Sequence, residues 1–259
     1  MNKAKPKRKS RSKKRKNTRS WKSKLFLSLV GMISLSGIGL YLAGFFDSHI
    51  HYGIHIPQGF TTHGIDISQY QGKINWDTVC APQDDNVPIS FVYMRATMGL
   101  RTDKQFQYNW QETRKHGLKR GAYLYFHPHK DGVKQAELYI KRVGSLKSCL
   151  PPVVDIEKKY RVNNKTLRKR LQDCLNHLES HYGIKPIIYT YTTFYRDYLG
   201  ADFDHYPLWI AHYEREDKPD YISRSWDIWQ HSERGVLRGI DEFVDFNVWN
   251  SDSQLVIND

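Results

Sequence analysis

Cysteine is scarce in this chain of 259 residues, and its surroundings exclude several kinds of site. The three cysteines, Cys80, Cys149 and Cys174, form no C-x-x-C pair, and no histidine stands beside them at the spacing of a metal site. We therefore expect no metal and no cofactor. In an exported domain either two of the cysteines form a disulfide or all three remain thiols, and the spacing does not choose between these alternatives.

Acidic residues are absent from residues 1–24, which carry 13 of the chain's 40 Lys and Arg side chains. The rest of the chain therefore has 27 basic and 27 acidic side chains and is formally neutral, although the net charge of the whole is +13. Because the basic block adjoins an apolar segment, it is typical of a cytoplasmic tail that sets topology and contacts anionic lipid headgroups. We expect no nucleic-acid partner.

A single long uncharged segment follows at residues 25–46. As a helix it would be roughly 33 Å long, enough to cross the hydrocarbon core of a bilayer. A cleaved signal peptide is the alternative, but its apolar region normally has about 7–15 residues, and no clear A-x-A site follows here. We predict an uncleaved signal anchor, a single-pass cell-membrane protein and a folded domain on the extracytoplasmic side, periplasmic or cell-wall.

After a short tether at residues 47–62, strand-like runs alternate with helical patterns. In the segment 165–182, Leu167, Leu171 and Leu175 recur on one helix face. This alternation predicts parallel β/α units in a domain at 63–250, followed by a tail at 251–259. The fold class is therefore α/β, as a modified, irregular (β/α) TIM-like barrel, with a doubly wound open sheet as the alternative. The expected strands are 64–67, 89–95, 121–126, 152–156, 186–191, 208–211, 226–230 and 243–246, and the expected helices are 103–116, 133–143 and 165–182.

Acidic residues stand at the ends of three of these strands, where such barrels carry their catalytic groups. Asp155 and Glu157 end the fourth strand and point to the same face, because Ile156 points to the other. Two adjacent carboxyl groups push each other's pKa apart, so one of them can stay protonated and act as an acid. Taken alone, such a pair is more often a solvated loop start. Asp66 ends the first strand and Asp245 the eighth, however, and a closed barrel brings those two together.

A series of short motifs occurs in order between about Thr62 and Asn250. The motifs are GIDISQYQGKINW at 64–76, FVYMRATMG at 91–99, GAY at 121–123, DIE at 155–157, WQ at 229–230 and VDFN at 244–247. Together, though not singly, they resemble the glycoside hydrolase family 25 lysozymes, the Chalaropsis-type muramidases.

This resemblance implies an enzyme that hydrolyses the β-1,4 bond between N-acetylmuramic acid and N-acetylglucosamine in the glycan strands of peptidoglycan. It implies that Glu157 is the general acid and that Asp155 assists the substrate's own 2-acetamido group, which serves as the nucleophile. We expect partial burial beside an ionised Asp155 to raise the pKa of Glu157. Asp66 and Asp245 would complete the catalytic acids of the cleft, although acids at a barrel seam also serve to hold backbone N–H groups.

Other residues at the strand ends are candidates for binding substrate. Arg95 contacts substrate or neutralises the acids, and we favour neutralisation. The aromatic residues either stack on sugars or pack in the core. The family often has His-Phe directly after the third-strand motif and Tyr after Trp-Gln. This chain departs from that pattern with Leu124–His127 and His231, and we expect both positions to line the cleft. The candidate substrate-binding residues are Arg95, Tyr125, His127, Tyr189, Trp209, Gln230 and Asn247.

Two other functions stay open at this point. One is a peptidoglycan-binding module without activity, which the complete set of acids disfavours. The other is a chitinase-like N-acetylglucosaminide hydrolase, since that class also ends a strand in D-x-E. Such enzymes normally carry further acids just upstream on the same strand, whereas Val153 and Val154 stand there in this chain.

Overall fold

The computed structural model describes residues 50–83, 87–213, 219, 224–253 and 255. The predicted basic tail at 1–24 and the predicted membrane span at 25–46 lie outside these ranges. Among the described residues, none of the helices has both the length and the apolar character that a membrane crossing requires. Cys80, Cys149 and Cys174 all have free thiols, so the structure forms no disulfide from them.

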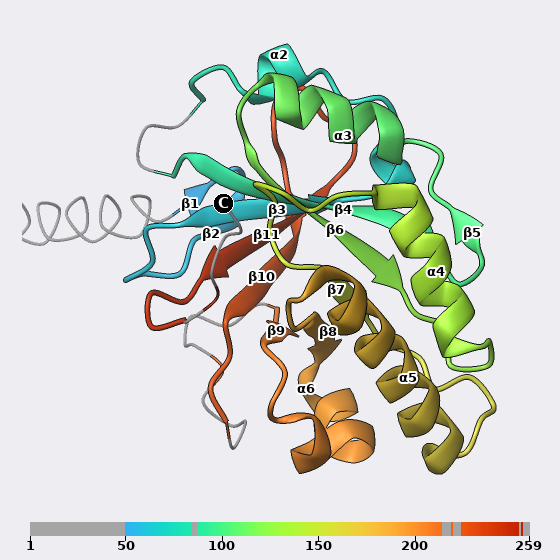
Figure 1. Cartoon of the computed structure of the whole chain (residues 1–259). Coiled ribbons are helices and arrows are strands. Elements are labelled where there is room, and N and C mark those ends of the chain that lie inside the picture. Colours follow the sequence, from blue (N-terminus) through green and yellow to red (C-terminus); the bar gives the residue numbers. More distant parts are fainter. Residues whose placement is uncertain (1–49, 84–86, 214–218, 220–223, 254, 256–259) are drawn as a thin grey trace, which may run out of the picture. The chain divides into compact units, whose positions relative to one another are not determined.

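In the described part of the chain, eight strands close into a barrel (Figure 1). Closure comes from β3, which pairs with both β4 and β11, while the short β5 (Arg101–Thr102) extends the end of β4 outside the ring. This confirms the predicted barrel and excludes the open sheet. In their order around the ring the strands are β3 (His63–Ile67), β4 (Ile89–Met98), β6 (Lys119–Tyr125), β7 (Val153–Asp155), β8 (Ile187–Tyr191), β9 (Leu208–Ala211), β10 (Ile228–Gly235) and β11 (Val244–Trp249).

The last strand departs from the predicted pattern. From β3 to β10 every neighbouring pair of strands in the ring is parallel, whereas β11 is antiparallel to both β10 and β3. Residues 236–243 are too few for the crossover that a parallel neighbour needs, so the chain turns back on itself. Asp245 was predicted to lie at the end of its strand, but it lies near the start of β11. The reversed direction places it opposite Asp66, its Cα partner.

Three long helices lie against the outer face of the first half of the barrel (Figure 1). The apolar face predicted for the third of them is confirmed, since Leu167, Leu171 and Leu175 are buried. This helix begins after Asn163, whose side chain accepts a hydrogen bond from Thr166 N, and ends at Gly183, which adopts a left-handed conformation with φ of 70°. The long helices are α3 (Phe106–Lys115), α4 (Gly132–Val143) and α5 (Asn164–Tyr182).

The remaining helical pieces are short and make the barrel irregular. After β8 the chain forms α6 (Thr192–Phe194), a single π-helical turn (Tyr195–Leu199) and a 3₁₀ turn (Gly200–Phe203) in place of a long helix. Between β3 and β4 it forms a 3₁₀ turn (Gln69–Gln71) and α2 (Trp76–Val79). These segments agree with the prediction of a modified, irregular barrel.

The segment predicted as a tether contains a folded hairpin. Strands β1 (Ile50–His51) and β2 (Ile54–His55) pair antiparallel. At the turn between them, Tyr52 donates a hydrogen bond to Val87 O at 2.8 Å, and its ring centroid lies 4.9 Å from that of Phe246. The hairpin at residues 50–55 is therefore packed on the barrel.

Apolar and aromatic side chains fill the interior of the barrel. Phe91, Tyr93, Val153, Ile187 and Trp209 belong to one buried cluster inside the ring. The second and larger cluster packs the helices against the outside of the strands. Because the interior is a packed core and not a pore, space for a ligand is left at the end of the barrel.

The contact between α4 and α5 gives a test of this packing. A Cβ atom at Gly132 would lie 2.0 Å from the backbone oxygen of Arg170, so the two helices must separate to accept alanine. We expect Gly132→Ala to lower the free energy of unfolding by about 2 kcal/mol, as measured by urea denaturation. Lys134→Ala, at an exposed position of the same helix, is the control. Equal stability of the two variants would contradict the close approach.

Candidate active site

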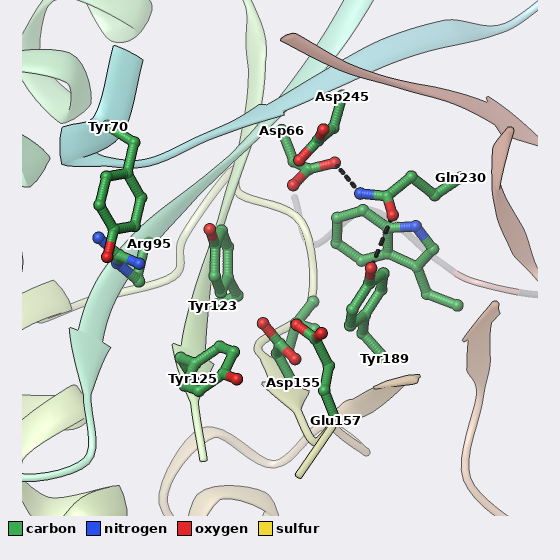
Figure 2. A pocket seen from close by; sticks show the side chains of 12 residues that line it. Asp66, Tyr70, Arg95, Tyr123, Tyr125, Asp155, Glu157, Tyr189, Gln230 and Asp245 are labelled. Atoms are coloured by element: carbon green, nitrogen blue, oxygen red, sulfur yellow. Dashed lines mark hydrogen bonds between the residues drawn. The ribbon is translucent and has the colours of Figure 1, made fainter. Parts of the chain in front are cut away.

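The polar strand ends meet in one cleft of about 560 Å³ at the carboxyl end of the parallel strands (Figure 2). Of the predicted site residues, all line this cleft except Asn247, which lies behind Asp66, and His127, which lies beside Tyr125. Tyr70 and Tyr123 also line it and were not predicted as site residues, although both lie within the motifs. The lining residues are Asp66, Tyr70, Arg95, Tyr123, Tyr125, Val153, Asp155, Glu157, Tyr189, Trp209, Gln230 and Asp245.

One pair of carboxyl groups, Asp66 and Asp245, lies across the seam between β3 and β11. Burial raises the pKa of Asp66 to about 6, against the effect of hydrogen bonds from Asn247, Gln230 and Asp245. Burial also raises the pKa of Asp245, to about 9, assisted by the charge of Asp66 and by the hydrogen bond to it. Near neutral pH Asp245 is therefore protonated and donates to an ionised Asp66.

Two amide side chains fix the orientation of Asp66. Its Oδ2 accepts hydrogen bonds from Gln230 Nε2 at 2.7 Å and from Asn247 Nδ2 at 2.8 Å. The oxygen of Gln230 accepts from the hydroxyl groups of Tyr189 and Tyr213, both at 2.6 Å, as Figure 2 shows for Tyr189. The oxygen of Asn247 accepts from Trp209 Nε1 at 2.8 Å. Since each amide oxygen already has a donor, each amide nitrogen is turned to the carboxylate.

The second pair is Asp155 at the end of β7 and Glu157 two residues beyond it. Burial, the charge of Glu157 and a hydrogen bond to it hold the pKa of Asp155 well above its ordinary value. Burial also raises the pKa of Glu157, while the hydrogen bond from Asp155 opposes this rise. The raised pKa predicted for Glu157 agrees with this direction. The prediction of an ionised Asp155 does not, because Asp155 is the more deeply buried acid and so holds the shared proton in the free protein.

One oxygen of this pair is unsatisfied. Asp155 Oδ1 is buried and has no hydrogen-bond partner among the described residues. The side chain is only 5% exposed, yet it lines the cleft. A buried carboxyl oxygen without a partner is costly unless a donor meets it, so this atom can accept a hydrogen bond from a ligand in the cleft.

Arg95 lies at the side of the cleft under an exposed aromatic ring. Its Nε donates to Asp103 Oδ2 at 2.9 Å, and its guanidinium carbon lies 5.0 Å from the centroid of Tyr70, which Figure 2 shows next to it. The positive charge lowers the pKa of Asp155, although this effect is smaller than that of burial. Arg95 therefore has the predicted neutralising effect, but its direct ion-pair partner is Asp103 and not an acid of the cleft.

His231 does not line the cleft, contrary to the prediction. It is 4% exposed and contacts the rings of Trp229 and Phe246. The reason is the alternation of side chains along β10, since Gln230 points into the cleft and its neighbours point away. Burial, with smaller effects of His63 and His55, lowers the pKa of His231 to about 3.

Histidine, cysteine and acidic side chains form no metal-binding arrangement in the described ranges. No group of three or more of them is placed to hold an ion. The acids of the cleft are instead hydrogen-bonded to amides and to one another. Carboxyl groups that share protons in this way suit proton transfer.

The chain matches a known family over most of its folded part. The model of the family described as "Glycosyl hydrolases family 25" matches residues 65–240. The chain belongs to this family. Its matched residues extend from β3 to the turn before β11 and include Asp66, Asp155 and Glu157.

Similar proteins support this assignment. The protein YegX of Escherichia coli (strain K12), described as uncharacterized, is 40% identical over 200 residues, which cover 77% of this chain and 73% of YegX. Lysozyme M1 of Streptomyces globisporus is 29% identical over 203 residues, covering 72% of this chain and 67% of the lysozyme. A solved family 25 glycosyl hydrolase from Bacillus anthracis superposes with a TM-score of 0.69 at 29% identity, covering 77% of this chain and 93% of that one. The chain is thus a glycoside hydrolase of the lysozyme family.

The Asp66–Asp245 pair makes stability depend on pH. Because the pKa of Asp245 is about 9 in the folded protein and 3.8 ordinarily, its contribution to the free energy of unfolding is present at low pH and is lost as pH rises towards 9. We expect the Tm of the protein to fall between about pH 6 and pH 9. Asp245→Asn keeps a donor to Asp66 but cannot ionise, so its Tm should fall less over this range.

Thermal unfolding followed by circular dichroism checks this expectation. Asp252→Asn, which removes an exposed carboxylate outside the cleft, is the matched control and should keep the pH dependence of the unmodified protein. An Asp245→Asn variant whose Tm falls as steeply as that of the control would show that Asp245 is already ionised at neutral pH.

Proposed function

We propose that this family 25 enzyme hydrolyses the β-1,4 bond between N-acetylmuramic acid and N-acetylglucosamine in peptidoglycan, with Glu157 as the proton donor. The observation that carries the proposal is the unequal exposure of the Asp155–Glu157 pair. Asp155 is almost fully buried at the end of β7, whereas Glu157 is only partly buried and stands nearer to solvent. The more accessible acid of the two can reach a glycosidic oxygen.

The first chemical step follows from the single proton that this pair shares. When the sugar occupies the cleft, its acetamido N–H donates to the unpaired Asp155 Oδ1, which favours the ionised form of Asp155 and leaves the proton on Glu157. Glu157 gives this proton to the glycosidic oxygen as the bond to C1 breaks. The acetamido carbonyl oxygen attacks C1 and forms a cyclic oxazolinium ion, whose positive charge Asp155 stabilises.

The second step restores the enzyme. Glu157, now ionised, takes a proton from a water molecule that attacks C1, and the oxazolinium ring opens back to the acetamido group. Asp66 supports both steps electrostatically, because its negative charge is fixed by Gln230 and Asn247 before any positive charge develops on the sugar. Asp245 keeps the proton that makes this arrangement stable.

Removing the proton donor tests the assignment. We expect Glu157→Gln to lower kcat by about 10²- to 10⁴-fold, since the amide cannot supply a proton but has the same shape. Mass analysis of the muropeptides released from purified peptidoglycan identifies the bond that is cut, and the amount released measures the loss of activity in the variant. Glu137→Gln, at an exposed position of α4, is the control and should stay active.

Three outcomes would count against the proposal. Folded, unmodified protein that releases no muropeptides would favour a peptidoglycan-binding module without activity. Efficient cleavage of chitin oligomers, which contain no muramic acid, would favour a chitinase-like hydrolase. Activity retained by Glu157→Gln would move the role of acid to another residue.

We also propose that residues 25–46 anchor the enzyme in the cytoplasmic membrane. The proposal is supported by the length of the uncharged segment and by the basic block at 1–24, which would stay in the cytoplasm beside anionic lipids. Residues 63–250 would then act on the peptidoglycan nearest to this membrane. A permanent anchor suits local remodelling of the wall better than its bulk lysis.

Fractionation of cells tests the anchor. We expect a C-terminally tagged chain to stay with the membranes after extraction with alkaline carbonate, because a spanning helix resists it. Protease added outside spheroplasts should degrade the tagged domain and spare a cytoplasmic control protein. A shortened, freely secreted form as the main species would show instead that the apolar segment is a cleaved signal peptide.

A further inference from the structure

A group of aromatic and imidazole rings lies beside the cleft and takes no part in the mechanism above. His127 and His129 are stacked, with centroids 5.2 Å apart and planes at 26°. Tyr160 lies 5.0 Å from His127 and 4.6 Å from His129. We call these three residues the rim cluster. It adjoins the cleft through Tyr125, whose ring meets His127 edge-on at 5.6 Å and whose hydroxyl is hydrogen-bonded to Tyr160.

Hydrogen bonds from two helices hold the turn that carries the two histidines. The buried side chain of Gln135 on α4 accepts from His127 N at 2.9 Å and donates to His127 O at 3.1 Å. From α5, Arg170 Nη1 donates to Pro128 O at 2.8 Å. The turn is closed by Lys130 N, which donates to His127 O at 2.9 Å. The rings are therefore presented on a preorganised support.

Two backbone features accommodate these rings at a conformational cost. Tyr160 has a φ of 52°, a left-handed conformation that is rare for a bulky residue. Gly99 leaves room for His127, since a Cβ atom there would lie 2.7 Å from His127 Nδ1. Strained residues of this kind are more frequent at binding sites than elsewhere.

The rim cluster is surrounded by positive charge. After burial, the pKa of His127 is lowered by the neighbouring His129 and by three cations, Lys130, Arg101 and Lys158. The three long cations of this set are exposed to solvent. The nearby acid Asp131 is engaged in capping α4, where its Oδ1 accepts from Lys134 N at 2.9 Å. The rim thus carries positive charge beside a cleft floor made of carboxyl groups.

We propose that the rim cluster, with Arg101 and Lys130, is a second binding site for a unit of the glycan strand that carries an anionic stem peptide. The inference rests on the proposed function and deepens it. A strand that leaves the cleft past Tyr125 meets flat rings, on which the apolar face of a sugar can stack, and then cations that can pair with the free carboxylates of the peptide. The site would make the enzyme prefer peptide-bearing over peptide-free glycan.

Binding of two probes separates the contribution of charge from that of the rings. The probes are soluble peptidoglycan strands with their stem peptides and the same strands after an amidase has removed the peptides. Full-length protein in detergent micelles, with Glu157→Gln to prevent cleavage, is titrated with each. We expect Arg101→Gln/Lys130→Gln to weaken binding of the peptide-bearing strand by about threefold to tenfold and to leave the peptide-free strand unchanged.

A matched control has the same change in net charge. Lys141→Gln/Lys147→Gln removes one exposed cation in the last turn of α4 and another just beyond the helix, and this variant should bind both probes like the parent protein. Equal weakening by the two double variants, or equal weakening for the two probes, would overturn the role of Arg101 and Lys130.

The rings are tested at Tyr160. Asn tolerates a positive φ, so Tyr160→Asn removes the ring without straining the backbone, whereas Tyr160→Phe keeps the ring and removes only the hydroxyl. We expect Tyr160→Asn to weaken binding of both probes by about threefold to tenfold and Tyr160→Phe to bind both like the parent protein. If the two variants bind alike, the rim cluster does not contact the sugar.

These measurements do not depend on catalysis. Unmodified protein that binds peptide-bearing strands through the rim but releases no muropeptides would refute the proposed reaction and keep the binding site. Protein that cleaves peptidoglycan but shows no preference between the two probes would refute the binding site and keep the reaction.

Discussion

The hydrogen bond between Asp245 and Asp66, made across the antiparallel pair β11 and β3, is the interaction on which the cleft depends. Two buried carboxyl groups tolerate this contact only because one keeps its proton and the other accepts from two amides. The amide of Gln230 is in turn oriented by tyrosines and that of Asn247 by a tryptophan. Strands β3, β8, β9, β10 and β11 therefore contribute to one network. Closure of the barrel and the electrostatics of the site have a common cause.

The two carboxyl pairs have different tasks, and their hydrogen bonds show it. At the seam the ionised oxygen of Asp66 has two amide donors, and the proton of Asp245 completes the pair, so its geometry is fixed before substrate arrives. In the other pair, Asp155 keeps an unpaired buried oxygen and Glu157 is partly open to solvent. Asp155 Oδ1 is one of several buried side-chain atoms without a hydrogen-bond partner among the described residues, but it is the one that belongs to a residue lining the cleft, where a ligand can complete it. The incomplete pair is therefore the reactive one.

Much of the fold could be predicted, because the periodic spacing of apolar residues in the sequence indicates which side chains become buried. The face of α5 at Leu167, Leu171 and Leu175 and the eight strands followed from it, and the family motifs indicated the four acids. The direction of β11 did not follow, because alternation reads the same in both directions and only the short connection at 236–243 decides it. The sequence also does not tell which of Gln230 and His231 points into the cleft, or that Asp155 and not Glu157 holds the shared proton. Both depend on how deeply each side chain is buried in the folded protein. Tyr70 lies on a turn after β3, where no periodicity marks a side chain as part of a cleft.

The positions of the cations around the cleft are consistent with the raised pKa values of its acids. A free cation on the floor would lower the pKa of the acids there, and Lys158 already has this effect on Glu157 against the effect of burial. Arg95, the cation that lines the cleft, is held in an ion pair with Asp103, which limits its pull on the acids. A protein that must keep a proton on Asp155 or Glu157 and also attract an anionic polymer therefore has to separate the two functions in space. Acids occupy the floor, and the exposed cations Arg101, Lys130 and Lys158 lie at the rim, beyond Tyr125.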